Sequence, residues 1–131
     1  MPPPKQNGGV MRREYTTKMT GQTLKLEANA AAPYVYKAIF KKNLFAEFET
    51  LQEKDDADKT SLIDGLTFTF AMMAEKPLRE VLSLTIVDFY EFLTRFETIE
   101  LVDEDLVRLV TSMWAEGAET SSEAKNLQSP Q

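Results

Sequence analysis

The chain has 131 residues, of which 15 are Lys or Arg and 21 are Asp or Glu, so its formal net charge is −6. It contains no histidine and no cysteine. These absences exclude disulfides, zinc fingers, thiol nucleophiles and hydrolases of the Ser-His-Asp type, because each needs an imidazole or a sulfur. The length fits one domain, and a hydrophobic content of 43% is sufficient for a buried core.

The charge is unevenly distributed along the chain. Residues 1–25 carry five basic residues and one acidic residue, whereas residues 26–131 carry ten basic and twenty acidic residues, a net charge of −10. A negatively charged body repels the phosphate backbone, so we expect no binding to nucleic acid. The basic N-terminal stretch is expected to be a solubilising tail and strand edge, with contact to RNA or to an acidic partner as the alternative.

The two ends of the chain are poor in large apolar residues. We expect a disordered basic arm over 1–11, a single globular domain over 12–116 and a disordered polar tail over 117–131. The first nine residues hold three prolines and two glycines where a secretory signal would need an apolar core. The longest apolar stretch, Leu66 to Ala74, is too short to span a bilayer. These features predict a cytoplasmic protein that does not interact with membranes.

Two segments near the N-terminus have the patterns of β-strands. Glu14 to Thr20 is rich in threonine and aromatic residues, and Thr23 to Glu27 has apolar residues at alternate positions. Gly21 lies between them and can adopt a positive φ, so the pattern predicts a β-hairpin. Because two strands alone are marginally stable, we expect the hairpin to pack against helices.

The residues after the hairpin indicate two short helices. The spacing of apolar residues and Pro33 in the first turn predict a helix over 31–41. Asn43 can cap a second helix with an apolar stripe up to Leu51. Residues 52–59 are then expected to form a solvated connection. The aspartates in this connection lack the glycine and glutamate of a calcium loop, so we expect no metal site.

A third helix is predicted from Thr60 or Ser61 to Glu75. Most of its large apolar residues share one face, but Phe68 and Met72 lie on the opposite one. We expect a central helix that is buried all round, with Gly65 permitting a close neighbour. The alternative is that Phe68 and Met72 form an exposed patch for a partner.

Two further helices are predicted before the last one. Pro77 opens a short helix through Leu82, and Thr85 begins another with Asp88 in its first turn, in a pattern that resembles a capping box. The second of these is expected to carry an aromatic stripe as far as Phe96. Such a stripe is more typical of a core than of a surface that stacks nucleic-acid bases.

The last helix is predicted to begin with the acidic residues Asp103 to Asp105, since the helix dipole favours negative charge at that end. Trp114 is expected at the edge of its apolar stripe, and Gly117 is expected to end it. Leu106, Leu109, Val110 and Met113 are expected to face inward.

The predicted fold class is α+β and mostly helical, with an N-terminal β-hairpin followed by about five α-helices and flexible tails at both ends. The chain lacks a phosphate-binding glycine loop, and its carboxylates cluster in helix first turns and linkers, where capping and solubility explain them. We therefore expect no enzymatic activity, no catalytic residue and no cofactor. A binding or assembly protein is the remaining class.

Several segments resemble the tail assembly chaperones of long-tailed phages and prophages of Gram-positive bacteria. The resemblance extends over roughly residues 23–126. The segments that carry it are Thr23 to Leu26, Tyr36 to Phe45, the Leu62 to Ala74 helix that ends in Met-Met-Ala, Thr85 to Phe96, and Trp114 to Gly117 with the polar tail that follows.

The resemblance implies a small chaperone of phage tail morphogenesis in the host cytoplasm. Such a chaperone binds the tape measure protein, keeps its long hydrophobic helices soluble, helps recruit the tail tube protein and is absent from the mature virion. It also implies a longer form of the chain made by a ribosomal frameshift, which is a further candidate partner. We hypothesise that the codons of Lys125 and Asn126 form the slippery run.

Apolar side chains on the helices are the candidate contacts for a helical client. The alternative to a transient chaperone is a structural virion component or a small helical adaptor with a permanent protein partner. The candidate partner-binding residues are Phe68, Met72, Phe92, Phe96 and Trp114.

Overall fold

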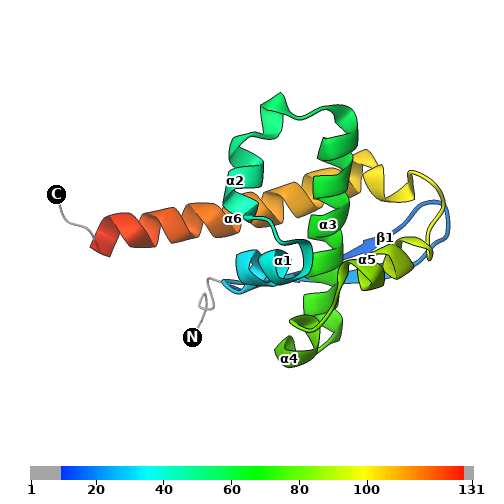
Figure 1. The fold of residues 1–131 in the computed structure, drawn as a ribbon, viewed down its shortest axis with the longest axis horizontal. Coiled ribbons are helices and arrows are strands. Elements are labelled where there is room, and N and C mark those ends of the chain that lie inside the picture. The colour runs from blue at the N-terminus through cyan, green and yellow to red at the C-terminus, as the bar shows by residue number, and fades with distance from the viewer. Residues whose placement is uncertain (1–9, 129–131) are drawn as a thin grey trace.

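A computed structural model describes residues 10–128 of the chain, with the side chains of residues 10–116. The predicted class is confirmed, because an antiparallel hairpin precedes a mostly helical body (Figure 1). In chain order the elements are β1 (Met11–Thr16), β2 (Thr23–Ala28), α1 (Ala32–Phe40), α2 (Leu44–Glu49), the 3₁₀-helix η1 (Leu51–Glu53), α3 (Asp56–Glu75), α4 (Leu78–Val81), α5 (Ile86–Leu93), the 3₁₀-helix η2 (Glu100–Val102) and α6 (Glu104–Gln128).

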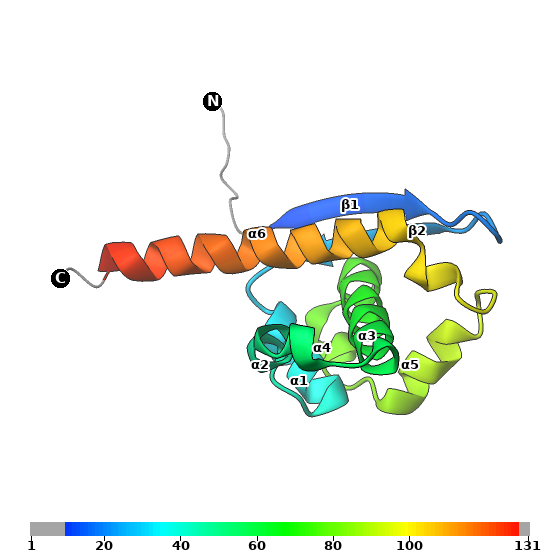
Figure 2. The same cartoon turned by 90° about the horizontal axis from the view of Figure 1, so that it is seen from above.

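Helix α3 lies at the centre of the molecule. Figure 2 shows it almost end-on, with the hairpin and α6 on one side and α1, α2, α4 and α5 on the other. Every residue from Gly65 to Met73 is buried, which confirms the prediction of a helix that is buried all round. The hydroxyl groups of its buried threonines have hydrogen-bond partners within the helix, since Thr67 and Thr69 each donate to the carbonyl oxygen four residues earlier.

Gly65 is the position where α1 comes closest to α3. A Cβ atom at this residue would lie 3.2 Å from Cζ of Phe40 and 3.3 Å from Cε2 of Tyr36. These separations are shorter than ordinary carbon contacts. The absence of a side chain therefore lets two aromatic rings of α1 pack onto α3, which confirms the prediction that Gly65 permits a close neighbour.

The hairpin covers α3 with one face of β2. Leu24, Leu26 and Ala28 alternate along β2 and are all buried, and Arg13 pairs opposite Leu26 in the antiparallel register. The predicted hairpin is confirmed, but β1 begins at Met11 and ends at Thr16, four residues before the predicted end. Residues 17–22 form the connection instead, with Gly21 at φ 71°.

The ends of the early helices follow their capping residues. Asn43 caps α2, because its side chain accepts a hydrogen bond from the backbone N–H of Ala46. The predicted start of α3 at Thr60 or Ser61 is wrong. Asp55 accepts from the N–H of Asp58 and caps the helix four to five residues earlier, so part of the expected solvated connection is helical. Aspartates in the first turn also suit the helix dipole.

Helix α5 begins as expected but ends early. Asp88 accepts from the backbone N–H of Thr85 at 2.7 Å, which is one of the hydrogen bonds of a capping box and confirms the predicted pattern. The helix stops at Leu93, so Phe96 belongs to the irregular segment that leads to η2. Thr94 at the C-cap donates both its hydroxyl and its backbone N–H to the carbonyl of Glu91, which supplies partners for a carbonyl group of the last turn.

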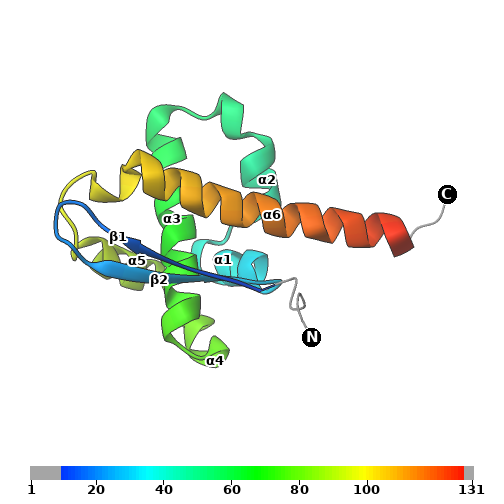
Figure 3. The ribbon, with the colours of Figure 1, turned by 180° about the vertical axis from the view of Figure 1, so that it is seen from behind.

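The last helix is longer than predicted. Leu106, Val110 and Met113 are buried as expected, but α6 continues through Gly117 to Gln128, so the expected stop at Gly117 is wrong. Residues on both sides of this glycine, such as Ala115 and Glu119, are strong helix formers that outweigh its cost of about 1 kcal/mol. Figure 3 shows the second half of α6 extending away from the body.

The predicted tails fall partly outside the described residues. Residues 1–9 and 129–131 lie outside them, which includes most of the predicted arm over 1–11. Within the predicted tail over 117–131, the backbone of 117–128 follows the helical path of α6. Disorder of either end stays a prediction.

Candidate functional site

The predicted partner-binding residues are mainly core residues. Phe68 and Phe92 are 1% exposed and Met72 is 3% exposed. The ring of Phe68 lies 5.2 Å from that of Phe92 and 5.5 Å from that of Phe89, so α5 covers this face of α3. The alternative of an exposed patch at Phe68 and Met72 is therefore wrong. Burial of an aromatic side chain of this size contributes about 2–3 kcal/mol to folding.

Trp114 lies apart from these residues. Its ring is 4.9 Å from that of Phe45 and 5.6 Å from that of Phe48, with which it stacks at an interplanar angle of 20°. It is 9% exposed and fixes α6 against α2. The five predicted residues therefore do not form one binding surface.

A row of α3 residues spaced four apart faces α5 and the segment that follows α5. Two pockets open along this row, because α5 does not fill all the space beside it. Phe68, Met72 and Phe92, three of the five predicted residues, line a pocket of about 280 Å³. The row consists of Thr60, Asp64, Phe68 and Met72 of α3 and of Lys76, which caps the C-terminal end of this helix.

Two of the charged residues at the rim of this first pocket already have partners. Arg95 lies 5.2 Å above the ring of Phe92 and 3.7 Å from Glu75. Asp88 accepts the capping hydrogen bond at the start of α5. Lys76 and Glu91 also line this pocket, so it combines apolar side chains with charges of both signs and favours no single class of ligand.

The second pocket, which we call the Asp64 pocket, has a different character. It has a volume of about 340 Å³ and is lined by Thr60, Asp64, Leu93, Phe96, Glu97, Thr98, Ile99, Leu101 and Val102. Phe96 is the one predicted partner-binding residue among them. The Oδ1 atom of Asp64 is buried and has no hydrogen-bond partner within the described part of the chain.

The environment of Asp64 disfavours its charge. Desolvation by burial raises the pKa of this carboxyl from 3.8 to about 6. Buried polar atoms in folded proteins are almost always hydrogen-bonded, so an unpartnered carboxylate oxygen beside a pocket is an exception with a possible role in binding. The sequence analysis did not single out Asp64, although an aspartate within an apolar helix face was a detectable signal.

A third feature is a concentration of exposed apolar side chains on α4 and α5. Of the ten large apolar side chains exposed in the described part of the chain, five lie within 13 residues. We call them the α4–α5 apolar segment: Leu78, Leu82, Ile86, Val87 and Tyr90. In Figure 2 these helices lie on the side of α3 that faces away from the hairpin.

The exposure of this segment follows from its composition. The inward faces of α4 and α5 are already filled by Val81, Phe89 and Phe92, which are buried. The remaining large apolar residues must therefore point outward. The exposure of these residues was not predicted, because the whole apolar stripe of α5 was assigned to the core. The α4–α5 apolar segment nevertheless holds more apolar residues than one buried stripe needs.

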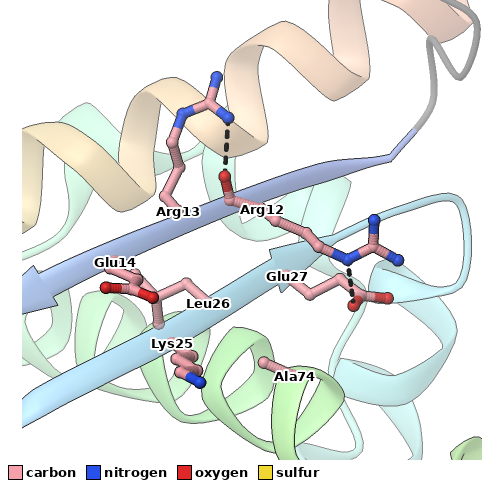
Figure 4. Close-up of a pocket in the computed structure, with 7 residues that line it drawn as sticks. All are labelled: Arg12, Arg13, Glu14, Lys25, Leu26, Glu27 and Ala74. Carbon is pink, nitrogen blue, oxygen red and sulfur yellow. Dashed lines mark hydrogen bonds and ion pairs between the residues drawn. The ribbon is translucent and has the colours of Figure 1, made fainter.

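A pocket of about 300 Å³, shown in Figure 4, is lined by charged residues of both strands together with Leu26 of β2 and Ala74 of α3. Arg12 and Arg13 are its most basic residues. Nε of Arg12 is 3.2 Å from Oε1 of Glu27, and Arg13 donates to the backbone carbonyl of Arg12. Both guanidinium groups are thus already engaged within the chain.

Among the described residues, acidic side chains do not gather in groups of three or more that could hold a metal ion. Within residues 10–128, no helix combines the length and apolar character that crossing a membrane requires.

Comparisons of the chain with protein-family models, with curated proteins and with solved structures find no match.

Proposed function

We propose that this chain is a phage tail assembly chaperone that binds the tape measure protein through the α4–α5 apolar segment. The proposal combines the family resemblance with one structural observation, the five large apolar side chains exposed within 13 residues. Concentrations of exposed apolar side chains mark interaction surfaces in soluble proteins.

The chemistry of the segment suits a helical client. Val87 and Tyr90 are three residues apart on α5, so they project from the same side of this helix. An amphipathic client helix can lay its apolar face against such side chains. Two exposed acidic residues, Glu80 between Leu78 and Leu82 and Glu91 directly after Tyr90, oppose self-association of the free chaperone.

The proposed test is co-expression with the long helical protein encoded next to this gene, followed by measurement of how much of that protein stays soluble. Tyr90→Ser and Val87→Ser should each lower the soluble fraction several-fold, because each removes about 1–2 kcal/mol of apolar contact. Tyr34→Ser is the matched control, since Tyr34 is 74% exposed on α1, outside the segment, and Tyr90 is 57% exposed. Equal effects of Tyr90→Ser and Tyr34→Ser would contradict the proposed surface.

The main alternative is a structural virion component or an adaptor with a permanent partner. Mass spectrometry of purified particles separates the two, since a chaperone is absent from them and a structural component is retained. The frameshifted longer form is tested by reading the gene. A slippery run near the codons of Lys125 and Asn126, with an overlapping downstream frame, is expected.

A further inference from the structure

We propose that the Asp64 pocket binds the cationic side chain of an arginine or lysine residue from a protein partner. This site is distinct from the α4–α5 apolar segment. It is defined by the residues of α3, η2 and the segment between α5 and η2 that line it.

The walls of the pocket suit the aliphatic stem of such a side chain. Five of its nine lining residues are large and apolar, and they come from α5, the following segment and η2. Ile99 is 69% exposed and stands at the surface beside the pocket. Long basic side chains commonly bury their methylene groups on such surfaces while their charged ends reach a polar group.

The polar groups of the pocket suit a cation. Asp64 and Glu97 are its charged residues, and no basic side chain lines it within the described residues. The Oδ1 atom of Asp64 is buried and unpartnered, so an incoming donor would meet the other oxygen of the carboxylate. A guanidinium or ammonium group there would supply a charge-assisted hydrogen bond and compensate the negative charge that the two oxygens share.

Other classes of ligand fit less well. An anion would be repelled by the two carboxylates, and a neutral apolar group would leave Asp64 without a partner. A hard metal ion requires about six oxygen ligands, which a mostly apolar wall does not provide. A positively charged group on an apolar stem provides both contacts, because the stem packs against the apolar walls and the charge pairs with Asp64.

The Asp64 pocket is a different part of the surface from the proposed chaperone site, and cation binding there can be measured with a small probe in place of the tape measure protein. Failure of one proposal therefore leaves the other standing.

The test is an NMR titration of the isotope-labelled protein with N-acetyl-arginine N-methylamide at constant ionic strength. We expect saturable shifts at Asp64 and at residues 97–102, with a Kd on the order of 1–10 mM for so small a probe. The matched neutral probe is N-acetyl-citrulline N-methylamide, which replaces the guanidinium by a urea of the same shape. It should bind about tenfold more weakly, because it lacks the charge that strengthens the hydrogen bond to Asp64.

Two variants keep the test specific. Asp64→Asn should abolish the preference for arginine over citrulline, and Asp58→Asn, an exposed acid on the same helix outside the pocket, should retain it. As a second measurement, saturating arginine probe should lower the pKa of the Asp64 carboxyl, followed through its carbon resonance. Equal binding of both probes, absence of saturable shifts in this region, or an unchanged pKa would each overturn the proposal.

Discussion

Two carboxylates that border η2 have opposite surroundings. Glu100 is 4% exposed and accepts hydrogen bonds from the backbone N–H groups of Met19, Thr20 and Glu97 at 3.1, 2.7 and 2.9 Å, and from the hydroxyl of Thr20. Asp64 lines the pocket that η2 also borders, and one of its oxygens is unpartnered. Glu100 holds two parts of the fold together, whereas Asp64 has no such structural role.

The same contrast appears in their acidities. Partial desolvation alone would raise the pKa of Glu100, but hydrogen bonds from Thr20 and Glu97 outweigh it and lower the pKa to about 2. For Asp64 only desolvation acts, and the pKa rises to about 6. A satisfied acid stabilises the free protein, whereas an unsatisfied one destabilises it until a partner arrives, and this difference separates a structural acid from a binding acid.

The largest effect is expected for Glu100→Gln. One carboxylate oxygen accepts from the N–H groups of Met19 and Thr20 and the other from the N–H of Glu97, so the NH₂ group of glutamine removes an acceptor from at least one backbone N–H in either orientation of the amide. We expect a fall in Tm on the order of 10 °C, measured by circular dichroism. Glu97→Gln is the control, since the exposed Glu97 side chain should change stability by less than about 0.5 kcal/mol.

The contribution of Glu100 should also depend on pH. Its folded pKa lies below its ordinary value of 4.5, so its stabilisation is fully present above that value and is lost as pH falls toward 2. The Tm difference between Glu100→Gln and the unaltered chain should therefore shrink in this window. An unchanged Tm for Glu100→Gln at pH 7 would show that Glu100 does not stabilise the fold and so does not differ from Asp64 in this respect.

A smaller effect of opposite sign is expected for Asp64→Asn. The folded pKa of Asp64 is raised, so its charge destabilises the fold fully above about pH 6 and not below about pH 4. After allowance for partial exposure, we expect the variant to be about 1–2 kcal/mol more stable at pH 7 and no more stable at pH 4. Urea titrations at the two pH values measure this, and destabilisation at pH 7 would show that Asp64 has a structural partner.

The smallest effect is expected for Ile99→Gly, on the wall of the Asp64 pocket. Ile99 has a φ of 63°, a left-handed conformation that is unfavourable for a β-branched residue. Glycine removes this strain, which stabilises the fold, but its greater conformational entropy in the unfolded chain offsets part of the gain. We expect a net increase in the free energy of unfolding of about 0.5–1 kcal/mol. The same variant should bind the arginine probe more weakly, because it removes part of the apolar wall. A loss of stability would show that the side chain contributes more to packing than its exposure indicates.

The features that sequence reasoning predicted are those set by neighbouring residues. The hairpin follows from strand alternation around Gly21, and the caps at Asn43 and Thr85 follow from side chains within three residues of the groups they bind. The burial of α3 was predictable because its apolar residues occupy two faces. In each case the decisive interaction is local or follows from composition alone.

The features that sequence reasoning did not predict depend on distant contacts. Glu100 meets Thr20 across 80 positions of the chain, so nothing near either residue indicates the pair. Asp64 is isolated only because Leu93, Phe96 and η2 close around it. The continuation of α6 past Gly117 was missed because one glycine was given more weight than the helix formers around it.

The projecting half of α6 has a practical consequence for experiments. A helix of 25 residues is about 37 Å long, and its C-terminal end points away from α4 and α5 (Figure 1). An affinity tag, fluorophore or fused domain attached after this helix would be held at a distance from both proposed binding surfaces. Capture through such a tag therefore leaves the α4–α5 apolar segment and the Asp64 pocket free.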